Sequence, residues 1–374
     1  MTNEELSRLR AASPRALTHH LPQSPREALY ALAAATPPQL RADKYGAADW
    51  LQAFEARIAR ELGKSAAVFM PSGTMAQQIA LRLWAERRGC PNVAFHPTCH
   101  LEIHESLAYA FLHALRAVPV GAPSQLMTPE DVRAIADPLA ALLVELPQRE
   151  IGAQLPPWEA LLALIAAARS KGAALHLDGA RLWESAPHYG RSHADIAALF
   201  DSVYVSFYKG LGALAGAVLA GDDDFIAEAR VWQHRHGGRL VTIAPLTLSA
   251  QFAFERNLPK MAAYRERARA IASRFAEIDG LEIEPNPPHI NTFHVFVRGE
   301  RDVLEARAHA YAKERGTFVF ARLAPISVPL QHKWEFVVGD ATMALDVADI
   351  VAAVRYVVTA SEPAPGRKHR ALAY

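Results

Sequence analysis

The chain has 374 residues, of which 51% are hydrophobic and 21% charged, and its formal net charge is +1. This length exceeds one small core, so we expect two domains, and the near-neutral charge argues against a nucleic-acid partner. No apolar run approaches the roughly 18 residues of a membrane span, so we expect no membrane association. Two cysteines are too few for a disulfide framework or a thiolate zinc site. We therefore expect a soluble cytoplasmic protein.

The N-terminal 40 residues are rich in alanine, proline and arginine, and we expect a short helix or two within an N-terminal arm over 1–40. Apolar residues then recur at a spacing of three to four in DWLQAFEARIARELG (49–63). They are Trp50, Leu51, Phe54, Ile58 and Leu62. This pattern predicts an amphipathic helix that ends at Gly63.

Short apolar runs then alternate with longer helical patterns. The runs are AAVFM (66–70), NVAFH (92–96), HALRAVPV (113–120), ALLVEL (141–146), AALHLD (173–178), SVYVSFY (202–208) and GAVLAG (216–221). Helical patterns such as GTMAQQIALRLWAERR (73–88) and PWEALLALIAAARSKG (157–172) lie between them. The alternation predicts an α/β fold, with a mostly parallel seven-stranded sheet covered on both faces. The last two runs are too close together for a helix, so we expect one antiparallel strand.

After about residue 250 the pattern changes. One or two long helices are expected over 248–278, and further helices over 300–316 and 346–358. Strands are expected in GLEIEP (280–285), NTFHVFV (291–297), GTFVF (316–320) and KWEFVVG (333–339). We therefore expect a large domain over 41–250 and a smaller α+β C-terminal domain over 251–374.

Ser72, Gly73 and Thr74 open the helix that follows the first of these strands. A glycine lets the backbone approach a ligand closely, two hydroxyls can donate hydrogen bonds, and a helix N-terminus favours an anion. This turn is therefore a candidate phosphate-binding site. The alternative is an ordinary helix cap, where serine and threonine are common in any case.

Two ionisable residues stand at the ends of other predicted strands. Asp178 is costly to bury unless it is paired, either with Arg181 or with a protonated ring nitrogen of a ligand. Lys209 leaves its strand for the glycine-rich turn GLGA (210–213), and partial burial would lower its pKa and make it a nucleophile, although a lysine that extends to solvent is the ordinary case. Because ligands bind at the carboxyl ends of parallel strands, the three features together predict a pyridoxal phosphate site.

The segment HPTCHLEIHE (96–105) spaces His96, His100 and His104 four residues apart. On a helix this spacing would align three imidazoles as in a metal site. His96, however, follows an apolar strand and precedes Pro97, so we expect the segment to begin in a loop.

Four segments resemble the L-threonine aldolases of the β-eliminating lyase group. They are FMPSGTMAQQIAL, LHLDGARLWESA, ALFDSVYVSFYKGLGALAGAVLAG and FIAEARVWQHRHGG. The resemblance implies the aspartate-aminotransferase fold, fold type I of the pyridoxal phosphate-dependent transferases. It also implies that the cofactor is pyridoxal 5'-phosphate, that the substrate is an amino acid, and that the reaction cleaves a β-hydroxy amino acid, threonine or allo-threonine, to glycine and an aldehyde.

The resemblance also implies roles for individual residues. Lys209 forms the Schiff base with the cofactor, Asp178 pairs with its pyridine nitrogen, and Arg181 contacts it. Ser72, Gly73 and Thr74 hold its phosphate. His100 stacks on the ring and acts in catalysis, with Glu105 five residues later, so no metal is expected; His96 and His104 are then structural or supporting residues.

The resemblance fails at the residue expected to bind the substrate carboxylate. The family has an arginine on a late strand, and Glu335 stands at that position here. Arg322 is an alternative for this role. Members of the family form homodimers or homotetramers with sites at the subunit boundary, so Tyr45 is a candidate to bind substrate there.

Two other functions stay open. One is another reaction on the same cofactor, either β-elimination or transamination. The other is a non-catalytic relative on the same fold. No G-x-G-x-x-G segment follows the first strand, so a nicotinamide enzyme is not expected.

Overall fold

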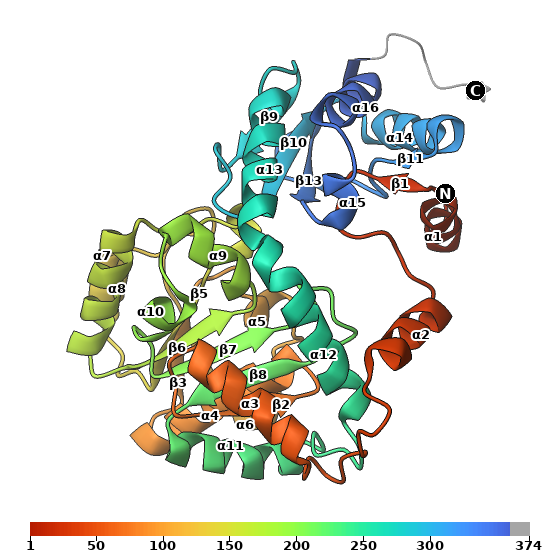
Figure 1. Ribbon diagram of the computed structural model, residues 1–374. Helices are drawn as coiled ribbons and strands as arrows, with labels where there is room; N and C mark the ends of the chain where they lie inside the picture. Colours follow the sequence, from red (N-terminus) through yellow and green to blue (C-terminus); the bar gives the residue numbers. More distant parts are fainter. Residues whose placement is uncertain (360–374) are drawn as a thin grey trace, which may run out of the picture. The chain divides into compact units, whose positions relative to one another are not determined.

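The computed structural model describes residues 1–359 (Figure 1). The chain divides into two compact units, one over Gln23–Arg265 and the other over Met1–Pro22 with Glu266–Tyr374. Each unit is built around a sheet of its own.

These units do not share the bounds expected from the sequence, which were 1–40, 41–250 and 251–374. Met1–Pro22 joins the C-terminal unit because β1 (Arg15–Ala16) pairs in parallel with β11 (Thr317–Phe318). The other division, at residue 265, falls within the continuous helix α13 (Met261–Phe275), where no change of composition marks it.

The unit over 23–265 contains a seven-stranded sheet. Its strands are β2 (Ala66–Met70), β3 (Asn92–Phe95), β4 (Arg116–Pro119), β5 (Ala141–Glu145), β6 (Ala174–Gly179), β7 (Ser202–Ser206) and β8 (Ala217–Gly221). Their order across the sheet is β2-β8-β7-β6-β5-β3-β4. β8 pairs antiparallel with β2 and β7, and the other pairs are parallel, which confirms the predicted mostly parallel sheet with one antiparallel strand.

Helices cover both faces of this sheet (Figure 1). The helices of this unit are α2 (Pro25–Ala35), α3 (Asp49–Glu61), α4 (Gly73–Arg88), α5 (His100–Ile103), α6 (Ala108–His113), α7 (Pro129–Ala134), α8 (Trp158–Ser170), α9 (Leu182–Tyr189), α10 (His193–Ala197), α11 (Asp223–Arg235) and α12 (Ala244–Asn257), with short 3-10 turns at η1 (Arg149–Ile151) and η2 (Leu258–Lys260). Of these, α2 packs on α12 and lies away from the sheet. Alternation along β2 assigns its two faces: Val68 joins the core formed with α4 and α11, whereas the Phe69 ring lies 6.4 Å from Phe54 of α3. The predicted helix over 49–63 ends as expected, with Gly63 at a φ of 60°.

Side chains from two helices cap the open edge of β2. Glu55 Oε1 accepts a hydrogen bond of 2.7 Å from the Phe69 backbone N–H, and Gln233 Nε2 donates one of 2.7 Å to the Phe69 carbonyl. Arg230 donates to Glu55 Oε2 at 2.6 Å and to the Ala67 carbonyl at 3.1 Å. These contacts satisfy backbone groups that would otherwise be open to pairing with another strand.

The other unit contains a four-stranded antiparallel sheet in the order β12-β13-β10-β9. The strands are β9 (Leu281–Glu284), β10 (Thr292–Arg298), β12 (Ala324–Pro325) and β13 (Gln331–Val337). The helices are α1 (Asn3–Ala12), most of α13, α14 (Arg301–Arg315), α15 (Asp340–Met343) and α16 (Val347–Thr359). The expected α+β character is present, although the run over 316–320 forms only the two-residue strand β11.

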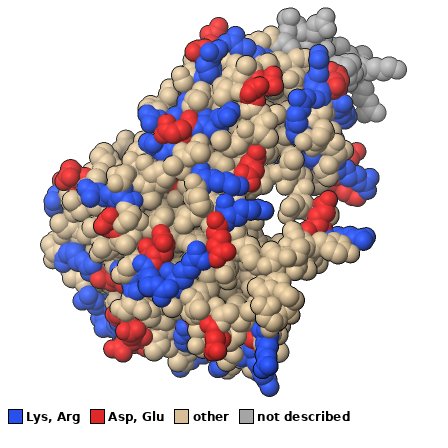
Figure 2. Space-filling model, in the orientation of Figure 1, with Lys and Arg blue, Asp and Glu red and all other residues tan. Residues whose placement is uncertain are grey.

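Charged residues are mixed on the face drawn in Figure 2, where Lys and Arg lie among Asp and Glu without an extended area of one sign. This agrees with the net charge of +1. Over residues 1–359, no helix is both long and apolar enough to cross a membrane.

Candidate active site

The turn between β2 and α4 presents unpaired backbone donors. Ser72 caps α4, and its Oγ accepts a hydrogen bond of 3.3 Å from the Met75 N–H. Within the described part of the chain, the N–H groups of Gly73 and Thr74 have no hydrogen-bond acceptor. Both the cap and the candidate anion site predicted from the sequence are therefore compatible with this turn, since the cap leaves two donors for a ligand.

Gly73 is required by close packing at this turn. A Cβ atom on Gly73 would lie 2.0 Å from the hydroxyl oxygen of Tyr204. Tyr204 is buried on β7, where it lies opposite Asp178 of β6 in the register of the two strands. The aromatic side chain thus fills the space between the first turn of α4 and the ends of the central strands.

Asp178 and Lys209 come together at the carboxyl ends of β6 and β7. Asp178 is 2% exposed, and its Oδ1 accepts a hydrogen bond of 3.0 Å from the Ala180 N–H. Burial raises the pKa of Asp178, and the nearby Lys209 ammonium opposes that rise. Burial likewise lowers the pKa of Lys209, while the Asp178 carboxylate acts in the opposite direction. The structure therefore brings together the two residues that the sequence placed at separate strand ends.

A second carboxylate, Glu145, completes this group and was not identified from the sequence. Glu145 ends β5 and lies opposite Asp178 in the register of β5 and β6. Burial and the Asp178 charge raise its pKa to about 8. The available signal was the same as for Asp178, a carboxylate that ends an apolar run.

His100 is held beside these residues by Glu105. The distance from His100 Nδ1 to Glu105 Oε1 is 2.9 Å, and Glu105 Oε2 accepts a further hydrogen bond of 2.9 Å from Gln78 Nε2 of α4. The positive charge of a protonated His100 lowers the pKa of Asp178, which places the imidazole near that carboxylate. The five-residue interval noted in the sequence thus corresponds to a direct contact.

The three histidines of 96–105 have different partners. His96 is buried, and its Nε2 lies 2.7 Å from the Gln125 carbonyl. His104 Nε2 lies 3.0 Å from Glu150 Oε1, and its ring centroid is 5.0 Å from that of His100. Only the four residues of α5 are helical, so the segment begins in a loop, as expected. Over residues 1–359, no group of three His, Cys, Asp or Glu side chains is arranged to hold a metal ion.

Arg181 is buried next to an acidic residue of α9. Its Nη1 lies 3.9 Å from Glu184 Oε1, and the two side chains are 9% and 1% exposed. The Arg181 charge acts to lower the pKa of Lys209, which places the guanidinium near that lysine.

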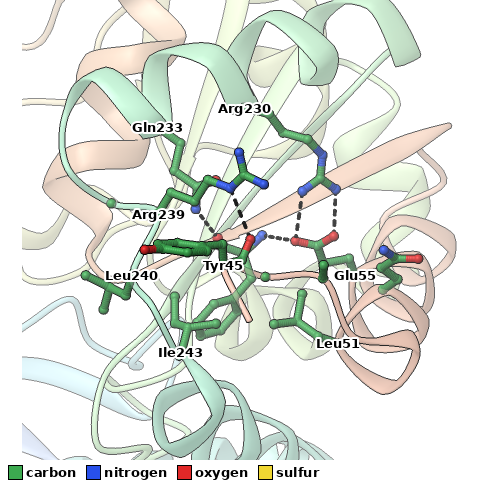
Figure 3. Close-up of a pocket in the computed structure, with 13 residues that line it drawn as sticks. Tyr45, Leu51, Glu55, Arg230, Gln233, Arg239, Leu240 and Ile243 are labelled. Atoms are coloured by element: carbon green, nitrogen blue, oxygen red, sulfur yellow. Dashed lines mark hydrogen bonds and ion pairs between the residues drawn. The ribbon is translucent and has the colours of Figure 1, made fainter. Parts of the chain in front are cut away.

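Tyr45 lies at a separate cavity of about 380 Å³ on the unit over 23–265 (Figure 3). Arg239 Nε donates a hydrogen bond of 3.1 Å to the Tyr45 carbonyl, and the Arg239 guanidinium lies 6.0 Å from the centre of the Tyr45 ring. Asp43 fixes this loop, since its carboxylate accepts hydrogen bonds from the backbone N–H groups of Gly46 and Ile243. The Tyr45 side chain is 45% exposed, so a ligand can reach it from solvent.

The two remaining residues that the sequence singled out belong to the other unit. Arg322 Nη2 donates hydrogen bonds to the Met1 carbonyl at 2.8 Å and to Asn3 Oδ1 at 3.3 Å. Glu335 lies on β13, opposite His294 of β10. A role for Arg322 in binding substrate stays a prediction.

Comparison with known families supports the sequence resemblance. The profile of a family described as "Beta-eliminating lyase" matches residues 33–300. Low-specificity L-threonine aldolase 1 of Arabidopsis thaliana is 28% identical over 65% of this chain and 70% of its own length. Aldolase vrtJ of Penicillium aethiopicum is 34% identical over 68% of this chain and 67% of its own length.

Solved structures of similar fold extend the match over almost the whole chain. A protein of Listeria monocytogenes EGD-E, provisionally described as an L-allo-threonine aldolase, superposes with a TM-score of 0.89 and 41% identity over 95% of this chain and 98% of its own. An Exiguobacterium protein, provisionally described as an aromatic amino acid beta-eliminating lyase/threonine aldolase, gives a TM-score of 0.90 and 37% identity, covering 94% and 99%. Serine palmitoyltransferase of Sphingomonas wittichii, at 14% identity and a TM-score of 0.66, shares the fold alone, with 89% of this chain and 83% of its own covered. The predicted fold type I architecture is thereby confirmed.

Proposed function

Because the chain belongs to the β-eliminating lyase family of pyridoxal phosphate-dependent enzymes, we propose that it cleaves a β-hydroxy amino acid, threonine or allo-threonine, to glycine and an aldehyde. The observation that carries this proposal is the grouping of Lys209 and Asp178 beside the N–H donors of Gly73 and Thr74, which have no acceptor among residues 1–359. An amine, an acid and an anion-binding turn are the three contacts that this cofactor needs.

The residues present fit the cofactor. We assign its phosphate to Ser72, Gly73 and Thr74, where two backbone donors among the described residues lack an acceptor and no side chain fits on Gly73. Asp178 would keep the ring nitrogen protonated, and Lys209 would attach to the cofactor covalently. Arg181 would add a positive charge near the ring, and His100 would stack on it. When bound, pyridoxal phosphate withdraws electrons from the α-carbon of an amino acid and so weakens the bonds to that carbon.

Within this arrangement His100 is our candidate for the base that removes the β-hydroxyl proton. If the Nδ1 proton is donated to Glu105 Oε1, at 2.9 Å, then Nε2 is left as the proton acceptor. Glu105 in turn is fixed by Gln78, so the imidazole has one preferred orientation. Which bond to the α-carbon breaks depends on how the residues of this chain would hold the substrate.

The test is to incubate the cofactor-loaded protein with L-threonine and with L-allo-threonine and to quantify products, using Lys209→Ala as the blank. We expect glycine and acetaldehyde in equal amounts, absent from the blank. Ammonia with a keto acid would replace the aldolase proposal with β-elimination, and a keto acid without free ammonia would indicate transamination. No product from any amino acid would favour a non-catalytic relative.

We include location and assembly in the proposal. Cys90 and Cys99 are both free thiols, which is compatible with a reducing cytoplasm. A homodimer or homotetramer is expected from the family resemblance, and Tyr45, at an exposed cavity, is our candidate to contact substrate at a subunit boundary. Light scattering of the purified protein measures the assembly, and a monomeric mass would contradict this part.

A further inference from the structure

An amino-acid substrate brings an α-carboxylate that the enzyme must hold, and this inference rests on the function proposed above. A carboxylate is best held by an arginine, through two parallel hydrogen bonds. The late-strand position expected to supply that arginine is occupied by Glu335, which has the wrong charge. Another cation close to Lys209 is therefore required.

Arg149 lies at the right place in the backbone. It begins η1, four residues after Glu145 at the end of β5. Its N–H donates a hydrogen bond of 3.2 Å to Glu145 Oε1, and Glu145 lies opposite Asp178 in the sheet register. The start of η1 is thus attached directly to the strand ends that form the proposed site.

The guanidinium of Arg149 extends toward the histidines of that site. Its Nη1 lies 3.1 Å from Glu150 Oε1 and 3.5 Å from His104 Nε2. The His104 ring is 5.0 Å from the His100 ring, which is the candidate base. The guanidinium, the two imidazoles and Glu150 therefore form one cluster at the edge of the site.

Arg149 is more exposed than Arg181, the other arginine of the site. The Arg149 side chain is 32% exposed, whereas that of Arg181 is 9% exposed. Arg149 is therefore the more accessible of the two arginines to a ligand in solvent. A guanidinium has five N–H donors and can contact more than one carboxylate.

Electrostatics agree with this placement. The Arg149 charge contributes to lowering the pKa of Lys209 and acts in the same direction on the pKa of Glu145. A positive charge that acts on both groups also attracts a nearby anion.

We propose that Arg149 binds the α-carboxylate of the substrate, with Glu150 and His104 holding its guanidinium in position. The subsite selects molecules that carry a carboxylate next to the amine. In this chain it takes the place of the arginine that the family has on a late strand.

The test compares two ligands that differ only in this group, glycine and glycinamide, by titrating the cofactor-loaded protein and following absorbance. We expect the unmodified protein to prefer glycine. Arg149→Gln should weaken glycine binding by about ten- to a hundredfold and leave glycinamide binding unchanged, because a charge-assisted pair is lost. Arg149→Lys keeps the charge but loses the paired geometry, so its loss should be smaller and again confined to glycine.

The matched control is Arg133→Gln on α7, where the arginine pairs only with Glu130 at the surface among the described contacts. It should bind both ligands like the unmodified protein. If Arg149→Gln keeps the full preference for glycine, or weakens both ligands equally, the proposal is wrong. If Arg149→Gln does not retain the cofactor, Arg149→Lys decides by the same two criteria. A protein that shows the Arg149-dependent preference for glycine but cleaves no threonine would refute the aldolase proposal alone.

Discussion

At the start of α4, Gly73 lies so close to Tyr204 that a Cβ atom would stand 2.0 Å from the tyrosine oxygen and 2.5 Å from its Cζ. Both neighbours are fixed, one by a helix and the other by the buried strand β7. A methyl group at this point must therefore displace the turn that we assign to the cofactor phosphate.

We expect Gly73→Ala to weaken binding of pyridoxal phosphate by about five- to 150-fold, corresponding to about 1–3 kcal/mol of overpacking. Fluorescence titration of the apoprotein measures this. Pyridoxal, which lacks the phosphate, serves as the control ligand and should lose less affinity. Equal losses for the two ligands would show that the turn does not contact the phosphate.

Glu145 gives a pH dependence to the stability of the cofactor-free protein. Its pKa is raised from 4.5 to about 8, so the folded state holds the proton more tightly than the unfolded chain. This stabilisation is complete below the unfolded pKa of 4.5 and is lost as the pH rises through about 8. Glutamine cannot ionise and avoids that loss.

The Glu145→Gln apoprotein should accordingly lose less stability than the unmodified apoprotein between about pH 6 and pH 9. We expect a difference of about 2 °C or more in the thermal midpoint at the alkaline end. Scanning calorimetry over this range provides the comparison. If the thermal midpoints of the two proteins change in parallel with pH, Glu145 is not held protonated by its surroundings.

Candidate residues for the site could be singled out from the sequence where a strand ends in an ionisable group. Asp178 and Lys209 each follow an apolar run, and the structure brings them together. Glu145 also ends an apolar run, but the sequence did not single it out. Its pKa is raised partly by the charge of Asp178, and the two carboxylates lie close together only because β5 and β6 are neighbours in the sheet. The order of the strands could not be read from the sequence. Arg149 had no comparable signal, since it lies in a loop.

At the scale of elements, the cap on the edge of β2 is a testable unit. Glu55 is 4% exposed and joins the Phe69 N–H to Arg230, which is partly exposed. Removing its carboxylate leaves a buried N–H without an acceptor and takes away the carboxylate that pairs with Arg230.

We expect Glu55→Ala to lower the free energy of unfolding by about 2–4 kcal/mol, measured by chemical denaturation. Glu255→Ala is the matched control. Glu255 pairs with Arg57, but both side chains are about 40% exposed, at 43% for Arg57 and 41% for Glu255. That pair should contribute less than about 1 kcal/mol. Similar losses in the two variants would contradict the role assigned to the edge cap.

The elements themselves followed closely from sequence periodicity. All seven apolar runs of the large sheet became strands, and the tight connection before β8 gave the antiparallel strand. The run over 113–120 shortened to β4, because α6 extends to His113 and Ala114 follows in a left-handed conformation. Strand order could not be predicted from periodicity, since it depends on contacts between elements far apart in the chain.

At the scale of the whole molecule, cofactor binding should stabilise the chain by mass action. At a hundredfold excess over the dissociation constant, this amounts to about 2.7 kcal/mol. We expect pyridoxal phosphate to raise the thermal midpoint by about 3–8 °C, and Lys209→Ala to show a clearly smaller rise. An equal rise in the variant would mean that the lysine does not hold the cofactor.

The division into units was the least predictable feature of the whole molecule. Met1–Pro22 joins the C-terminal unit through β1. This strand has two residues, which is too short for an alternating apolar pattern in the sequence to predict it. The boundary at residue 265 lies inside a continuous helix. Unit boundaries are usually predicted from the change of composition at a linker. Here the chain passes from one unit to the other within a helix, so no such change marks the boundary.

The most direct test of this account is to find where pyridoxal phosphate attaches. Borohydride reduction of the cofactor-loaded protein fixes the covalent link, and mass spectrometry of the resulting peptides identifies the lysine that carries it. We expect Lys209 to be modified and every other lysine, the partly buried Lys64 among them, to remain unmodified. A label on a different lysine, or no label on a protein that retains the cofactor, would contradict the assignment of the active site to the ends of β6 and β7.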